Sequence, residues 1–103
     1  MIDLKNIQNF YFVGIGGIGM SALALYFIKQ GKKVFGYDKT ASDITTNLIK
    51  EGVSIQYEDD VVKIPEDLMN KENSLVIFTP AIPKSNAILR WFNKEEYTVI
   101  KRA

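Results

Sequence analysis

The sequence contains no cysteine and no histidine. Without cysteine the chain has no disulfide bond and no thiolate chemistry, and without histidine it lacks the commonest metal ligand and the side chain best suited to proton transfer near neutral pH. Acidic and basic residues nearly balance, at 12 and 13, so a net charge of +1 supplies no broad field for nucleic acid or an anionic membrane. Any anion must therefore be bound locally, and the chemistry available to the side chains is narrow.

Long hydrophobic runs are missing as well. No stretch approaches the roughly 20 apolar residues of a membrane span, and residues 1–8 alternate polar with apolar side chains, unlike the apolar core of a signal peptide. A cytoplasmic location is the resulting expectation. With 103 residues, 47% of them hydrophobic, the chain can form one compact domain with a real core but not a multidomain enzyme. We expect residues 1–103 to form that single domain.

Short β-type runs alternate with helical segments along the chain. The expected strands are 10–15, 33–38, 53–57, 75–79 and 97–101. The expected helices are 18–30, largely buried and ended by Gly31; 43–51, capped by Ser42 with Ile44, Leu48 and Ile49 on one face; and 86–95, capped near Ser85. Residues 58–73 are expected to be a loop with at most a helical turn over 65–69. This alternation predicts a Rossmann-like, three-layer α/β domain with a mainly parallel five-stranded sheet.

A glycine-rich loop, Gly-Ile-Gly-Gly-Ile-Gly at 14–19, lies between the first expected strand and the first expected helix. Gly14 suits a tight turn, Gly16 lets a diphosphate approach the main chain, and Gly19 permits close packing of the helix on the strand. Free N–H groups at the helix start can bind phosphate oxygens without any cationic side chain. The alternative is a tight turn that only packs a helix on a sheet.

Asp38 ends the second expected strand, where a carboxylate can accept hydrogen bonds from a ribose hydroxyl or a base N–H. It could equally be a surface carboxylate that begins a turn. The glycine loop and Asp38 together predict a nucleotide site. The loop is not the phosphate loop of ATP hydrolases, because Gly-Lys-Ser/Thr is missing.

Several blocks of sequence resemble the Mur ligase family, specifically the N-terminal domain of its L-alanine-adding members. The longest is Gly-Ile-Gly-Gly-Ile-Gly-Met-Ser-Ala-Leu-Ala at 14–24. Weaker matches follow in the family's order: Gly-Tyr-Asp at 36–38, then Ser42, Thr45 and Leu48, Thr-Pro-Ala-Ile at 79–82, and Val-Ile-Lys-Arg-Ala at 99–103. Together they span most of the chain.

The resemblance implies part of a three-domain, ATP-dependent ligase of peptidoglycan biosynthesis that joins L-alanine to UDP-N-acetylmuramic acid. The N-terminal domain of such ligases holds the UDP part of the substrate, so we expect this domain to bind no cofactor and to be non-catalytic by itself. The domain that holds ATP and magnesium and the C-terminal domain, which helps to bind the amino acid, are expected to lie outside these residues. We expect no contact with nucleic acid or membrane.

The resemblance also assigns the substrate-binding residues. The diphosphate is expected near Gly14, Gly16, Gly17, Ile18 and Gly19; the uridine near Asp38 and Lys39; and the far wall of the cleft at Thr79, Pro80, Ala81 and Ile82. The sequence departs from the family pattern where Glu58 and Asp59 replace a common Gly-His pair and where Pro80 replaces a serine. No metal site is expected, because the acidic run at 58–60 lacks the spacing of a calcium loop.

Two other functions fit parts of the pattern. A freestanding NAD-binding module of a dehydrogenase or regulatory protein would use the same glycines and Asp38, although the extra Gly17 and the Met-Ser-Ala continuation at 20–22 argue against it. A structural domain that binds no nucleotide would leave the glycine loop as packing geometry alone.

Overall fold

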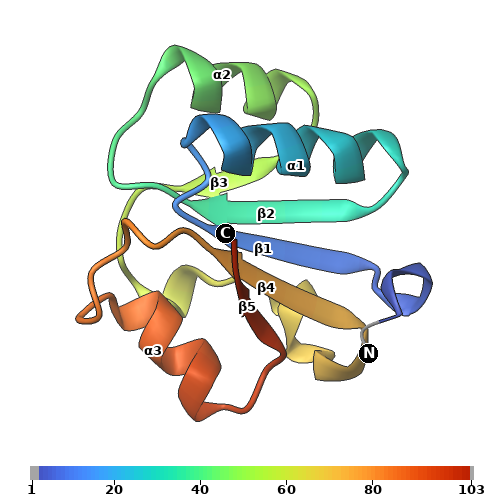
Figure 1. Ribbon diagram of the computed structural model, residues 1–103, viewed down its shortest axis with the longest axis vertical. Coiled ribbons are helices and arrows are strands. Elements are labelled where there is room, and N and C mark those ends of the chain that lie inside the picture. Colours follow the sequence, from blue (N-terminus) through green and yellow to red (C-terminus); the bar gives the residue numbers. More distant parts are fainter. Residues whose placement is uncertain (1–2, 103) are drawn as a thin grey trace.

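In the computed structural model, which describes residues 3–102, a parallel sheet lies between two helical layers (Figure 1). The strands are β1 (Asn9–Val13), β2 (Lys33–Tyr37), β3 (Ser54–Gln56), β4 (Ser74–Phe78) and β5 (Val99–Lys101), in the order β3-β2-β1-β4-β5. The helices are α1 (Ile18–Lys29), α2 (Asp43–Lys50) and α3 (Ala87–Lys94). Every strand pair is parallel, so the predicted three-layer α/β fold is confirmed. Met1 and Ile2 of the N-terminal segment and Ala103 of the last matching block lie outside the described residues.

The central strand β1 is buried on both faces, as expected for a strand of a parallel sheet. Phe10 and Phe12 point to the face covered by α1 and α2, and the ring of Phe10 stacks on Phe27 of α1 at 4.0 Å between centroids. Tyr11 and Val13 point to the opposite face, where α3 and the 3-10 turns pack. Figure 1 shows these helices on opposite sides of the sheet. The strict alternation along β1 therefore builds two separate apolar cores.

Three details differ from the sequence expectation. Helix α1 is not largely buried: Ile18 and Tyr26 are 83% and 57% exposed, because only one face of the helix meets the sheet and α2. Ile49 of α2 is 48% exposed for the same reason. The cap of α3 is Asn86 rather than Ser85, since the Asn86 side chain accepts the N–H of Leu89.

Residues 58–73 contain more local structure than the single expected turn. Three 3-10 segments occur there, η2 (Val61–Lys63), η3 (Glu66–Met69) and η4 (Lys71–Asn73), and a further one, η1 (Leu4–Asn6), precedes β1. Leu68 of η3 is fully buried in the second core. This connection therefore packs Leu68 onto the same face of the sheet as α3. Among the described residues, none of the helices has the length and apolar character that crossing a membrane would require.

Candidate functional site

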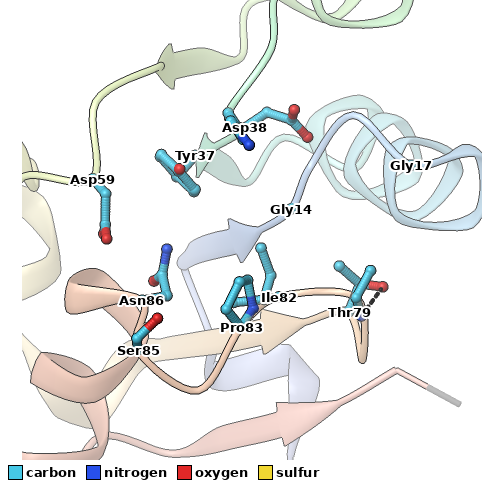
Figure 2. Close-up of a pocket in the computed structure, with 12 residues that line it drawn as sticks. Gly14, Gly17, Tyr37, Asp38, Asp59, Thr79, Ile82, Pro83, Ser85 and Asn86 are labelled. Atoms are coloured by element: carbon cyan, nitrogen blue, oxygen red, sulfur yellow. Dashed lines mark hydrogen bonds between the residues drawn. The ribbon is translucent and has the colours of Figure 1, made fainter.

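A cleft of about 440 Å³ opens at the carboxyl ends of β1, β2 and β4 (Figure 2). The chain leaves β1 toward β2 on one side and returns to β4 on the other, so the strand order reverses at this point. Ligands of open α/β sheets bind at such switch points, and the volume falls in the roughly 300–1,000 Å³ range of small-molecule sites. The cleft is lined by Gly14, Gly17, Tyr37, Asp38, Lys39, Asp59, Thr79, Ala81, Ile82, Pro83, Ser85 and Asn86.

The turn that leaves β1 depends on Gly14. Its φ is +90°, a left-handed conformation that favours glycine. The N–H groups of Gly14 and Ile15 both donate to the carbonyl of Tyr37, at 2.8 and 3.0 Å, which draws the turn over the end of β2. A Cβ on Gly14 would lie 2.4 Å from Cγ2 of Thr79, so the loop after β4 also needs this glycine.

Helix α1 begins at the cleft. Gly17 is its N-cap, with extended backbone angles of φ −68° and ψ 152°. The helical ladder starts where the N–H of Ser21 donates to the Gly17 carbonyl at 2.8 Å. The N–H groups before Ser21 have no acceptor within the helix, and the positive end of the helix dipole lies there. A Cβ on Gly17 would meet no atom closer than 3.8 Å, so the start of the helix is open on the side of the cleft.

Asp38 connects the loop after β2 to the glycine loop. Its Oδ2 accepts the N–H of Gly16 at 2.7 Å and its Oδ1 accepts the N–H of Thr40 at 3.0 Å. A Cβ on Gly16 would lie 2.7 Å from Oδ2, so Gly16 leaves room for the carboxylate. The sequence motif assigns Gly16 and Asp38 to a ligand; in the structure they contact each other.

The opposite end of the cleft is formed by Asp59 and Asn86. Both oxygens of Asp59 accept N–H groups at the start of α3, from Ala87 at 2.8 Å and Ile88 at 3.0 Å. Tyr37 lies in the wall between Asp59 and Asp38 (Figure 2). Burial raises the pKa of the Tyr37 hydroxyl, and the negative charges of Asp59 and Asp38 raise it further. Tyr37 therefore keeps its proton at neutral pH and can donate a hydrogen bond.

The structure brings most of the predicted site residues together. Gly14, Gly17, Asp38, Lys39, Thr79, Ala81 and Ile82 all line the cleft. Pro80 lines a separate hollow near Lys84 and Lys101. Gly16 and Gly19 contact side chains instead: Gly16 contacts Asp38, and a Cβ on Gly19 would lie 2.2 Å from Cζ of Arg102. Ile18 is exposed.

Five residues of the cleft were not among the predicted contacts: Tyr37, Asp59, Pro83, Ser85 and Asn86. Asp59 is visible in the sequence only as a departure from the family pattern, and Asn86 only as the first residue of an expected helix. Among the described residues no group of three or more Asp, Glu, His or Cys side chains could hold a metal ion.

The model for the family described as "Mur ligase family, catalytic domain" matches residues 9–103. The UDP-N-acetylmuramate–L-alanine ligase of Flavobacterium psychrophilum is 54% identical over 102 residues, 99% of this chain and 22% of the relative. The ligase of the same name from Christiangramia forsetii is 47% identical over 104 residues, all of this chain and 23% of the relative. The chain thus spans less than a quarter of the length of these relatives.

Two solved structures share the fold. A UDP-N-acetylmuramate–alanine ligase from Thermotoga maritima superposes with a TM-score of 0.76 at 34% identity, covering 91% of this chain and 20% of that one. The UDP-N-acetylmuramate:L-alanyl-γ-D-glutamyl-meso-diaminopimelate ligase of Neisseria superposes with a TM-score of 0.74 over 92% of this chain and 28% of that one. At 19% identity the second supports the fold alone.

Proposed function

The chain belongs to the Mur ligase family, and on that premise we propose that its cleft binds the UDP part of UDP-N-acetylmuramic acid. The names of the relatives give this sugar nucleotide as their substrate. The observation that carries the proposal is the position of the cleft, at the switch point of the sheet and open to the start of α1. That position matches the usual location of nucleotides in open α/β sheets.

The diphosphate is assigned to the end of the cleft near Gly17. The N–H groups that precede Ser21 lack acceptors within α1, and their dipoles add to that of the helix. Gly17 has no side chain to block approach, and an added Cβ would meet only Gly14 and Met20. Lys39 is an exposed cation in the lining of the same cleft and can add a favourable charge. The domain has a net charge of only +1, so binding depends on this local geometry.

The nucleoside is assigned to the region between Asp38 and Asn86. Asp38 keeps lone pairs free after accepting two backbone N–H groups, so a ribose hydroxyl can still donate to it. The loop at 79–82 forms the facing wall, with the half-buried side chain of Ile82 in the lining. These contacts stay predictions. The alternative of an NAD-binding module is not favoured, because the family match covers residues 9–103.

For the whole protein we propose an ATP-dependent ligase that adds L-alanine to UDP-N-acetylmuramic acid in peptidoglycan biosynthesis. The ATP and magnesium are assigned to parts of the ligase outside these 103 residues, because the chain has no Gly-Lys-Ser/Thr phosphate loop. Those other parts of the protein are then the partners of this domain, and they would close over the substrate. A cytoplasmic location remains an expectation.

Calorimetric titration of the chain with UDP-N-acetylmuramic acid, and in parallel with NAD, tests the proposal. Binding of the UDP-sugar without binding of NAD is the expected result. Binding of NAD alone would overturn it. Titration with UDP alone then shows whether the nucleotide part accounts for the affinity, as the assignment of the cleft requires.

A further inference from the structure

A second hollow, of about 560 Å³, lies next to the cleft and is not used by the proposed function. The loop at 79–82 borders both, because Ile82 lines the cleft and the hollow alike. The apolar part of the lining includes Phe78 and Ile82, which are half-buried, and Leu89, which is buried. The other lining residues are Pro80, Lys84, Arg90, Asn93 and Lys101.

The rim of this hollow carries positive charge only. Lys84 follows β4, Arg90 belongs to α3 and Lys101 to β5, and all three are exposed. No acidic residue lines the hollow, and none occurs in the sequence from 73 to 94. Within residues 3–102 none of the three cations makes an ion pair or a side-chain hydrogen bond. This basic hollow is therefore complementary to a surface that is both apolar and acidic.

The chain itself carries such a surface in the acidic turn, residues 58–62. A Glu-Asp-Asp run at 58–60 is followed by Val61 and Val62. Val62 is 89% exposed, the highest value of any large hydrophobic residue that the structure describes. The turn follows β3 and its η2 segment packs against α3, whereas the basic hollow lies on the side of β5. The acidic turn and the basic hollow thus both border α3.

Hydrogen bonds hold the acidic turn in one shape. Oδ1 of Asp60 accepts the N–H of Val62 at 3.0 Å. Nε2 of Gln56 donates to the carbonyls of Glu58 and Asp60, at 3.0 Å each. Ile64, two residues after the tip, is buried in the second core. Because the exposed valine is presented by a fixed backbone, little conformational entropy is lost when it enters a pocket.

We propose that two copies of this chain associate, with the acidic turn of each copy seated in the basic hollow of the other. Val62 of one copy contacts the apolar lining of the second, and the carboxylates of the turn face the cations of the rim. Because both surfaces border α3, a two-fold axis near that helix makes the contact twice and closes the assembly. The inference goes beyond the proposed function and does not depend on it.

Sedimentation velocity of the chain between about 10 µM and about 1 mM tests the association. At low ionic strength we expect a shift from monomer to dimer across this range. The contact joins exposed charges, so raising the salt from about 20 mM to about 500 mM should weaken it at least about tenfold. A monomer at every concentration at low salt would overturn the inference.

Val62→Ser tests the apolar part of the contact. The position is exposed, so the thermal unfolding midpoint should not change, while association should weaken at least about tenfold. Ile49→Ser is the matched control, because Ile49 is an exposed hydrophobic residue of α2, in the opposite helical layer. It should leave association unchanged. Equal association of the Val62→Ser and Ile49→Ser variants would overturn the inference.

Two double variants test the charges. Arg90→Glu with Lys101→Glu makes the rim acidic, and Glu58→Lys with Asp60→Asn makes the turn basic while keeping a capping side chain for η2. Each double variant alone should be monomeric, because its turn and its hollow then carry the same sign. A mixture of the two should form heterodimers, since both contacts again join opposite charges.

A charge control separates this contact from the net charge of the chain. Lys29→Glu with Lys50→Glu makes the same change in net charge as the rim variant, but in the layer of α1 and α2. It should associate like the unsubstituted chain. Loss of association in this control equal to that in the rim variant, or no heterodimer in the mixture, would overturn the inference. Titration with UDP tests the proposed function separately from all of these results.

Discussion

The amide nitrogen of Gly16 lies 2.7 Å from Oδ2 of Asp38, so the loops that follow β1 and β2 are joined by a charge-assisted hydrogen bond. The second oxygen of the same carboxylate holds the N–H of Thr40 at 3.0 Å. Asp38 therefore shapes the cleft before any ligand arrives. The N–H of Gly16 is already paired, so under the proposed function the diphosphate would use the N–H groups nearer the start of α1.

Removing the carboxylate of Asp38 is expected to destabilise the fold. Asp38→Ala leaves the N–H of Gly16 in a half-buried position without its acceptor and should lower the free energy of unfolding by about 1–3 kcal/mol. Urea unfolding followed by circular dichroism measures the change. Lys39→Ala alters the exposed neighbour and should stay within about 0.5 kcal/mol of the unsubstituted chain. Equal stability of Asp38→Ala and Lys39→Ala would show that the bond to Gly16 contributes nothing.

Stability at alkaline pH should depend on Tyr11. Its side chain is fully buried, and its hydroxyl donates to Oε1 of Gln56 at 2.8 Å. Burial raises the pKa of this hydroxyl well above the ordinary value of 10.0, and the charges of Asp59 and Tyr37 raise it further. Because the folded state disfavours the tyrosinate, the stabilisation is complete below pH 10.0 and is lost as the pH rises above it. Above pH 10, each tyrosine whose pKa is raised in this way lowers the free energy of unfolding by at most about 1.4 kcal/mol per pH unit.

Tyr11→Phe tests this pH dependence. The variant should be about 1 kcal/mol less stable at pH 7, because Gln56 loses a buried donor. Its free energy of unfolding should fall less steeply than that of the unsubstituted chain between about pH 10 and 11.5, measured by denaturant titration. Identical slopes for the two proteins would assign the alkaline loss of stability to other groups, such as Tyr37 and Tyr97, whose pKa values burial also raises.

Gly36 of β2 is expected to tolerate no side chain. An added Cβ would lie 2.6 Å from Cδ1 of Ile15 and 2.9 Å from the carbonyl oxygen of Phe12. The second contact is with the backbone of β1, so it cannot be relieved by a rotamer change. Gly36→Ala should cost about 1–3 kcal/mol in thermal or urea unfolding. An unaltered unfolding curve would mean that the β1–β2 pair can separate at no cost.

The sequence was sufficient to predict the parallel sheet and the helices that connect its strands, because β1 and β4 are short apolar runs bounded by glycine or proline. It was also sufficient to predict that Gly14, Gly17 and Asp38 share one cleft, since parallel pairing of β1 with β2 brings the loops after both strands to the same edge of the sheet. It could not show that Asp59 caps α3, a contact made across 28 residues from an acidic run that reads as solvated surface. Ser85 and Asn86 are both good caps by residue type, and only the packed structure decides between them.

Gly17→Val separates ligand binding from folding more cleanly than any other glycine in the loop. The backbone of Gly17 is extended, which suits a β-branched residue, and a Cβ there would meet no atom within 3.8 Å. Replacing this N-cap glycine by valine should lower the free energy of unfolding by no more than about 1 kcal/mol, measured by urea unfolding. If the diphosphate lies at the start of α1, the added methyl groups occupy its space, and affinity for UDP should fall at least about tenfold by calorimetry. Gly14→Ala, by contrast, should destabilise the fold itself, because φ is +90° and Thr79 is in the way. Gly17→Val with undiminished affinity for UDP would place the diphosphate elsewhere in the cleft.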